Sequence, residues 1–305
     1  MRILVTGAAG FVARHLAAEL LAHGHELHAT DIVDPKTMPN FVAADICDPE
    51  QVRALVRDVR PDACIHLGGI AFVPDGDRNP GRMLGINVGG TVNLLKACQA
   101  EAPKARFLFV STAQTYGCSP RADAEPVSEE LPLCPLSMYT ISKAAAEQAV
   151  RAWGVAFGLD VAIARPTNHT GPGQTTRFIV PSLVEQAKKI RRGEASAFVA
   201  GNLACGRDFA DVRDVVAAYR LLAERAGVGG TYNVSTGQHV TIAELLARIQ
   251  RLAGTDAPIE VDAALVRPTD FSRVLDTSRL RGELGWTPRF TLDDTLRDML
   301  DEEAK

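Results

Sequence analysis

The sequence predicts an α/β fold with a doubly wound parallel sheet at its centre. Short apolar runs alternate with longer helical patterns through the first half of the chain, and parallel strands need such crossover connections. Several runs are apolar without alternation, which is typical of strands covered by helices on both faces. The runs are RILVTG (2–7), ELHATD (26–31), FVAADI (41–46), ACIHLGG (63–69), RFLFVST (106–112) and LDVAIARP (159–166).

The remaining elements follow from periodicity and from capping signals. Apolar residues at helical spacing predict a helix over 11–24 that ends near Gly24. Thr241 and Glu244 form a capping-box pattern, which predicts that a helix begins there, and another helix start is predicted at Thr291. Further helices are expected at about 179–190 and 212–225, with strands at 196–200 and 231–235.

The chain is expected to form two parts. Glycine and proline cluster after Pro166 in RPTNHTGPG, which indicates departure from the main sheet. We expect residues 1–166, with about 210–240, to form the larger, dinucleotide-binding part. Residues 167–209 and 241–305 are expected to form a smaller, discontinuous substrate-binding part.

Composition narrows the class of partner. The net charge is −4, with acids and bases interspersed, so neither nucleic acid nor a membrane surface is an expected partner. No apolar stretch approaches a membrane span, and a strand starting at Arg2 leaves no room for a signal peptide, so we expect a cytoplasmic protein. No metal site is expected from the spacing of Cys and His. All cysteines are interpreted as reduced thiols: Cys47, Cys64, Cys98, Cys118, Cys134 and Cys205.

The first strand runs into a glycine-containing turn, TGAAGF, that opens the first helix. Gly7 and Gly10 would let the backbone approach a pyrophosphate, and the helix N-terminus favours its charge. Asp31 closes the second strand, where a carboxylate can accept hydrogen bonds from the adenosine ribose and would repel a 2′-phosphate. The pattern therefore predicts a dinucleotide site of Rossmann type that prefers NAD(H) and can accept NADP(H).

Tyr139 and Lys143 lie four residues apart on a predicted helix and so share one face. A cation beside a phenol favours phenolate, so we expect Lys143 to lower the pKa of Tyr139 and make it a proton carrier. Ser111 and Thr112 end the fifth strand, at the edge where α/β sheets hold ligands. Thr112, Tyr139 and Lys143 are therefore the candidate catalytic residues.

The motifs TGAAGF, STAQTYG, YTISK and RPTNHTGPGQ together resemble those of the extended short-chain dehydrogenase/reductase family, over almost the whole chain. The family's members act on nucleotide sugars and commonly form homodimers. The resemblance implies that the cofactor is contacted by Gly7, Gly10, Phe11, Val12, Asp31, Asp45, Ile46, Leu67, Gly68, Gly69, Asn87, Ser111, Tyr139, Lys143 and Pro166. It implies a substrate site made by Thr112, Asn168, Arg177, Val180, Arg207 and Arg267, with the last two binding the diphosphate.

Within the family, the later motifs are most similar to those of enzymes that reduce the C4 ketone of GDP-4-keto-6-deoxy-D-mannose to give GDP-D-rhamnose. Family dehydratases carry acidic residues where Ala113 and Gln114 stand here, so water elimination is not expected. A nucleotide-sugar 4-epimerase with tightly bound NAD remains an alternative, because it uses the same tyrosine and lysine. A non-catalytic dinucleotide sensor is a second alternative, although it would have no use for Thr112, Tyr139 and Lys143 together.

Overall fold

The computed structural model describes residues 1–117, 126–266 and 274–302. Its larger part is a seven-stranded parallel sheet with strand order β11-β6-β5-β4-β1-β2-β3. The order runs outward in both directions from β1, which is the doubly wound topology that the sequence predicts. The strands are β1 (Arg2–Thr6), β2 (Glu26–Asp31), β3 (Phe41–Ala43), β4 (Ala63–His66), β5 (Arg106–Val110), β6 (Val161–Pro166) and β11 (Thr231–Val234).

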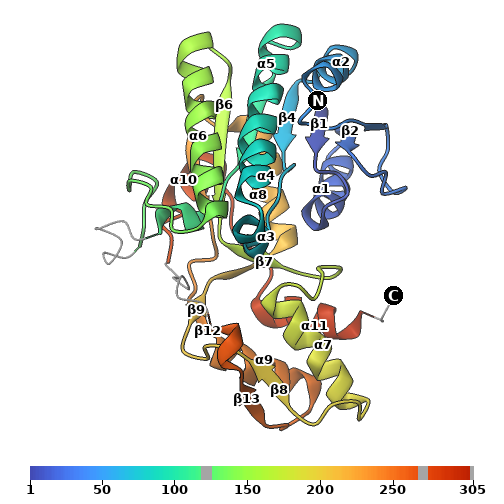
Figure 1. Cartoon of the computed structure of the whole chain (residues 1–305), viewed down its shortest axis with the longest axis vertical. Helices are drawn as coiled ribbons and strands as arrows, with labels where there is room; N and C mark the ends of the chain where they lie inside the picture. Colours follow the sequence, from blue (N-terminus) through green and yellow to red (C-terminus); the bar gives the residue numbers. More distant parts are fainter. Residues whose placement is uncertain (118–125, 267–273, 303–305) are drawn as a thin grey trace.

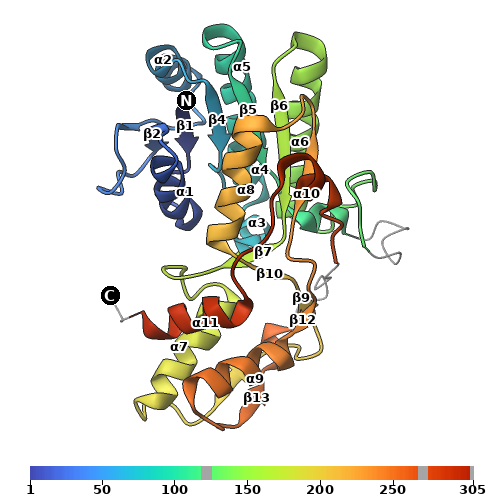
Figure 2. The same cartoon turned by 180° about the vertical axis from the view of Figure 1, so that it is seen from behind.

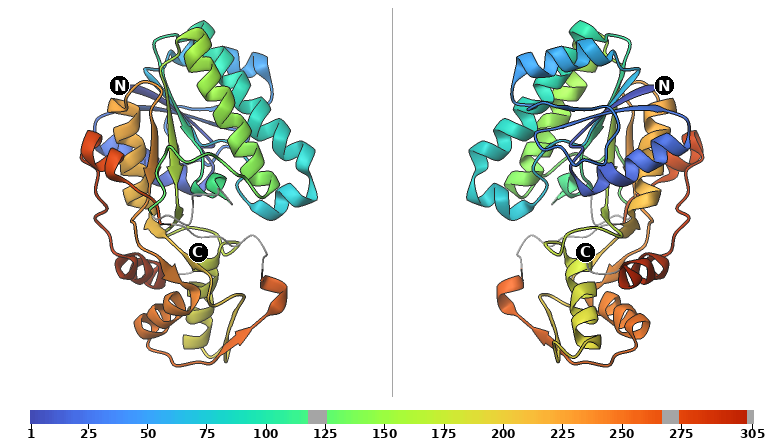
Figure 3. Two further views of the ribbon diagram at one scale, coloured as in Figure 1. Left: turned by 90° about the vertical axis from the view of Figure 1, so that its left-hand side faces the viewer. Right: turned by 90° about the vertical axis from the view of Figure 1, so that its right-hand side faces the viewer.

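Helices cover both faces of this sheet, so the chain has one apolar core on each side (Figures 1 and 3). One face carries α2 (Pro49–Val59), α5 (Thr91–Glu101) and α6 (Met138–Phe157). The other carries α1 (Phe11–Ala22), α8 (Val212–Arg225) and α10 (Ser278–Leu284). The central strands are buried on both faces, which explains why they lack polar alternation.

Register aligns the carboxyl ends of the central strands at one edge of the sheet. Thr6 of β1 pairs with Thr30 on one side and with His66 on the other. His66 in turn pairs with Phe109, next to the end of β5. Short helices follow at this edge: α3 (Val73–Arg78), α4 (Pro80–Leu84), the π-helix η1 (Gly85–Gly90) and the 3₁₀ turn η2 (Ala113–Tyr116).

The smaller part lies below this edge and has its own apolar core (Figures 1 and 2). Its helices are α7 (Ile179–Arg191), α9 (Ile242–Ala253) and α11 (Leu292–Asp301), and η3 (Ala263–Leu265) is a 3₁₀ turn. Its strands pair as β7 (Asn168–Thr170) with β10 (Phe209–Asp211), β8 (Phe198–Ala200) with β13 (Ile259–Val261), and β9 (Gly206–Arg207) with β12 (Val240–Thr241).

The capping box expected at Thr241 is present and starts α9, and the helix start expected at Thr291 is the start of α11, which also has a capping box. Leu280, Leu284 and Trp286 join the core of the main sheet, although the expected division assigned 241–305 to the smaller part. We therefore propose that α10 be counted with the larger part.

Two further observations concern the cysteines and membrane spans. Cys134 is disulfide-bonded, which corrects the interpretation of all cysteines as reduced thiols, whereas Cys47, Cys64 and Cys98 are thiols. Spacing in the sequence did not reveal which sulfur atoms the fold brings together. Among the helices that the structure describes, none is long and apolar enough to cross a bilayer.

Candidate active site

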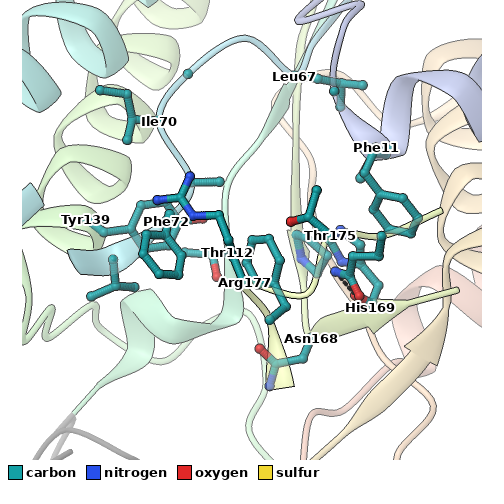
Figure 4. A pocket seen from close by; sticks show the side chains of 18 of the residues that line it. Phe11, Leu67, Ile70, Phe72, Thr112, Tyr139, Asn168, His169, Thr175 and Arg177 are labelled. Atoms are coloured by element: carbon teal, nitrogen blue, oxygen red, sulfur yellow. Dashed lines mark hydrogen bonds between the residues drawn. The ribbon is translucent and has the colours of Figure 1, made fainter. Parts of the chain in front are cut away.

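A cavity of about 1090 Å³ lies at the carboxyl ends of the strands, between the two parts of the chain. In Figure 4, Tyr139, Phe72 and Thr112 lie on one side of it, and Phe11, Thr175 and His169 on the other. The edge where parallel strands end is where α/β proteins bind their ligands. The cavity is therefore the candidate active site.

The turn between β1 and α1 forms one wall and depends on its glycines. Gly7 has a φ of +73°, and a Cβ there would stand 2.8 Å from the backbone nitrogen of Gly68. Gly10 is the N-cap of α1, and no side chain caps this helix end. A side chain at Gly7 would collide with the backbone after β4, so glycine is needed for this turn to pack there, and the uncapped N-terminus of α1 beside it is suited to an anionic group.

Asp31 connects this turn to the end of β2. Its carboxylate accepts hydrogen bonds from the Ala9 N–H at 3.0 Å and from the Ile32 N–H at 2.7 Å. The side chain lines the cavity beside the glycine turn. The carboxylate thus orders the turn and also faces the region where the adenosine ribose is expected.

The three candidate catalytic residues come from two separate elements and meet in the cavity. Thr112 follows β5 and caps η2, while Tyr139 and Lys143 lie on the first turns of α6. The Thr112 side chain lies close enough to the Tyr139 phenol to lower its pKa. The Lys143 ammonium donates to the Val110 carbonyl at 2.8 Å and lies 5.0 Å from the centre of the Phe109 ring.

Burial controls the pKa values of these groups. It raises the pKa of Tyr139 to about 12, against a smaller lowering effect of the nearby Thr112 side chain. Burial also lowers the pKa of Lys143 to about 8. The expectation that Lys143 lowers the pKa of Tyr139 is wrong for this structure, because loss of solvent around the phenol raises that pKa and the opposing effect comes from Thr112.

Most of the predicted cofactor residues line the cavity. They are Gly7, Gly10, Phe11, Val12, Asp31, Asp45, Ile46, Leu67, Gly68, Gly69, Ser111, Tyr139, Lys143 and Pro166. Asn87 does not line it. Its amide instead bonds both the N–H and the carbonyl of Ile70, at 2.8 and 3.1 Å, and the Ser142 hydroxyl at 2.8 Å, so it ties the segment after β4 to α6.

The predicted substrate residues Asn168, Arg177, Val180 and Arg207 also line the cavity, whereas Arg267 lies outside the described residues. The Arg177 guanidinium stacks on the Phe72 ring at 3.9 Å and pairs with Asp75 at 3.1 Å. Phe72 also meets Phe178 edge to face, with ring centres 5.9 Å apart. Arg177, Phe72 and Asp75, called here the mouth clasp, join the segment after β4 to the segment before α7.

Sequence reasoning missed two residues of the cavity, the buried Tyr219 and the half-buried His169. Tyr219 stands on the amphipathic helix α8, where a tyrosine is indistinguishable by pattern from an ordinary core residue. Its hydroxyl and that of Ser111 are buried and have no hydrogen-bond partner among the residues that the structure describes. Such hydroxyl groups, together with the glycine turn, fit a cavity that receives polar groups from a dinucleotide.

Comparison with known proteins agrees with this geometry. Residues 4–299 match the family described as GDP-mannose 4,6 dehydratase. The chain is 37% identical to GDP-6-deoxy-D-mannose reductase of Pseudomonas aeruginosa, over 99% of this chain and 96% of that protein.

Solved structures give the same relationship. The structure of RMD from Pseudomonas aeruginosa complexed with NADPH superimposes with a TM-score of 0.88 at 34% identity and covers 98% of each chain. The UDP-glucose 4-epimerase of Thermus thermophilus in complex with NAD gives a TM-score of 0.86 at 31% identity, covering 99% of this chain and 98% of that one. The chain therefore belongs to the GDP-mannose 4,6-dehydratase family, among the extended short-chain dehydrogenases/reductases that modify nucleotide sugars with NAD or NADP.

Proposed function

We propose that this protein reduces the C4 ketone of a nucleotide-linked 4-keto-6-deoxyhexose, with GDP-4-keto-6-deoxy-D-mannose as substrate and GDP-D-rhamnose as product. The observation that carries the proposal is that Thr112, the buried Tyr139 and, one helical turn further on, Lys143 line the same cavity at the carboxyl ends of the strands. The identity of 37% to GDP-6-deoxy-D-mannose reductase supports the choice of sugar and base.

Tyr139, Thr112 and Lys143 would each have a separate role in the reduction. A bound nicotinamide dinucleotide supplies the hydride to the ketone carbon. Tyr139 donates its phenolic proton to the C4 oxygen, and Thr112 holds that oxygen in line. The pKa of about 12 keeps Tyr139 protonated at neutral pH, as a proton donor must be. Lys143 donates one N–H to the Val110 carbonyl. Its ammonium has two further N–H donors, which would orient the cofactor ribose.

We infer that the substrate lies between Tyr139 and the smaller part. Asn168 and Val180 would contact the sugar, and Arg207 would bind the diphosphate, since a guanidinium suits phosphate oxygens. Arg177 would contact the substrate from the mouth clasp. Val180 is buried at the start of α7, so it can supply apolar contact only.

Water elimination is disfavoured by the residues beside Thr112. Ala113 has no ionisable group, and the Gln114 amide, which lines the cavity, cannot remove a proton from carbon at neutral pH. The chain therefore lacks the acid and base that a dehydratase would need at these two positions. A 4-epimerase remains the reaction that the experiment has to distinguish from reduction.

The test is product analysis. The purified protein is incubated with GDP-4-keto-6-deoxy-D-mannose and NADH or NADPH, and the product is identified by NMR. We expect one equivalent of reduced cofactor to be consumed and GDP-D-rhamnose to form. A protein that carries bound NAD, interconverts 4-hydroxyl epimers and consumes no added cofactor would instead be an epimerase.

Replacing Tyr139 by Phe tests the proton donor. We expect kcat to fall by about 10²- to 10⁴-fold, the usual contribution of a positioned acid or base, while dinucleotide affinity stays the same. Steady-state kinetics and a binding titration measure the two quantities. Full turnover in Tyr139→Phe would refute the mechanism, and would be the behaviour of a protein that only senses the dinucleotide.

We also propose a homodimer, by analogy with the family. Ile141 and Val155 of α6 are exposed apolar residues four helical turns apart, so one face of this helix could meet a second copy. Sedimentation velocity tests the proposal, and a monomer at micromolar concentration would refute it.

A further inference from the structure

A buried polar network lies behind the cavity and involves none of the residues assigned to catalysis. Its centre is Arg165 of β6, whose guanidinium binds both carboxylate oxygens of Glu147 on α6. The same guanidinium donates to the Tyr116 hydroxyl at 2.9 Å and to the Glu129 carbonyl at 3.1 Å. Arg165, Glu147 and Tyr116 are all 2% exposed or less, so solvent does not compete for these bonds.

Tyr116 connects this network to the catalytic segment. It ends η2, the single turn that Thr112 caps, and Thr115 in the same turn donates to the Thr112 carbonyl at 2.7 Å. The Tyr116 hydroxyl accepts from Arg165 and donates to the Asn233 amide oxygen at 2.7 Å, which uses both of its bonding roles. The turn that carries Thr112 is thereby fixed to β6 and β11.

Glu147 connects the same network to the helix that carries the other catalytic groups. It lies one turn beyond Lys143 and two turns beyond Tyr139 on α6. Arg165 therefore bridges the helix of Tyr139 and the turn of Thr112. The contact between Lys143 and Val110 makes a second tie between the same two segments, on the cavity side.

We propose that Tyr116 is a positioning residue, which the Arg165 bridge uses to hold the Thr112 hydroxyl against the Tyr139 phenol during proton transfer. The inference rests on the proposed reduction and deepens it. Buried ion pairs in general add little stability over apolar residues of the same volume, so we look for the role of this pair in what it positions. Here the pair stands between the two segments whose spacing the reaction needs, and a misplacement of about 1 Å can cost about 100-fold in rate.

The first experiment compares two tyrosines that lose the same atom. Tyr116→Phe removes a hydroxyl with two hydrogen bonds, and so does Tyr232→Phe. Tyr232 lies on β11 and does not line the cavity; its hydroxyl accepts from the Gly227 N–H and donates to Glu283 of α10. We expect similar losses of stability in urea. Only Tyr116→Phe should lose kcat, by about 10- to 100-fold, with KM and dinucleotide affinity changed less than about threefold.

The second experiment is a double-mutant cycle with Thr112→Ala. If Tyr116 acts through Thr112, then Tyr116→Phe should lower kcat less than about threefold once Thr112 is already Ala. A loss of stability alone would lower kcat by the same factor in both backgrounds. Equal losses in the two backgrounds, or an unchanged kcat in Tyr116→Phe, would overturn the inference.

The wild-type protein separates this inference from the proposed function. Absence of ketone reduction by the wild type overturns the function, before any variant is compared. An active wild type with an additive cycle overturns only the positioning role of Tyr116.

Discussion

At the scale of single residues, burial determines the chemistry of this site more than neighbouring charges do. It lowers the pKa of Lys143 to about 8 and that of His66 to about 3, and raises that of Tyr139 to about 12. His66 is held between the hydroxyls of Thr6, at 2.7 Å, and Thr91, at 3.0 Å, without needing a charge. Sequence reasoning found Tyr139 and Lys143 but erred on the pKa of the phenol, because periodicity does not show how deeply a helix face is buried.

The lowered pKa of Lys143 predicts a pH-dependent stability. Unfolded lysine has a pKa near 10.5, so between pH 8 and 10.5 the unfolded chain binds the proton that the folded chain has released. Stability contributed by this group is therefore smallest below pH 8 and rises with pH across that window. We expect Lys143 to account for a gain of about 2 kcal/mol between pH 7 and 9.5.

The matched control is Lys143→Met, which lacks the titrating group. Its free energy of unfolding in urea, minus that of the wild type, should be largest at pH 7 and should shrink by about 2 kcal/mol at pH 9.5. A difference that stays constant with pH would show that the ammonium is not desolvated in the folded protein.

Asp31 predicts the preference between the two cofactors. Asp31→Ala removes the acceptor expected for the ribose hydroxyls and the charge expected to repel a 2′-phosphate, so kcat/KM for NADH should fall relative to that for NADPH. Asp31→Asn is the control, because its amide oxygen can still accept from the Ala9 N–H while the charge is lost. If the ratio of the two specificity constants is the same in the wild type and both variants, the interpretation of Asp31 is wrong.

At the scale of elements, the sequence predicted helices and strands best where a single local pattern determines the secondary structure. The apolar runs became the strands of the main sheet, and the pattern of Thr241 and Glu244 became the capping box of α9, with Glu244 N–H bonding the Thr241 hydroxyl at 3.1 Å. The π-helix η1 was not predicted. This segment packs against α5 and α6, and the sequence of residues 85–90 alone does not show that packing.

The turn between β1 and α1 allows an element-scale test with a matched pair. Gly7 and Gly24 both have a φ near +75°, but no described atom lies within 4 Å of a Cβ at Gly24. Gly24→Ala should therefore cost only the left-handed backbone conformation, about 1–2 kcal/mol. Gly7→Ala should cost more by about 1–3 kcal/mol, because its Cβ would meet Gly68.

Unfolding in urea and dinucleotide titration measure both effects. We expect Gly7→Ala to lose dinucleotide affinity and Gly24→Ala to keep it. Equal stabilities and affinities in the two variants would show that the turn is not a close-packed cradle.

At the scale of the whole molecule, the active site exists because two separately packed parts meet at the carboxyl edge of one sheet. The sequence predicted two parts, and most of the residues that it proposed for the site line the cavity. It did not foresee the pairing of Arg165 with Glu147, the mouth clasp, or the Tyr219 hydroxyl, which has no partner among the described residues. The contacts of Arg165 and of Arg177 join residues 18 to 105 positions apart, and the position of Tyr219 depends on how one helix packs, so only the folded chain determines them.

Ligand binding should stabilise the whole molecule. A dinucleotide that binds only the folded chain adds about 2.7 kcal/mol at 100 times its Kd. We expect NAD(H) or NADP(H) to raise the unfolding midpoint of the wild type, with a smaller rise for Gly7→Ala at the same concentration. Thermal unfolding followed by fluorescence measures the shift. A midpoint independent of dinucleotide concentration would contradict cofactor binding in this cavity.

The mouth clasp has a consequence for how ligands enter. Arg177, which precedes α7 in the smaller part, stacks on Phe72 and forms an ion pair with Asp75. Phe72 and Asp75 both belong to the segment after β4, in the larger part. Any movement that separates the two parts at this entrance must break both contacts of the Arg177 guanidinium, the one with the Phe72 ring and the one with the Asp75 carboxylate. A ligand that needs a wider entrance than this one would therefore have to break both contacts of Arg177 before it enters.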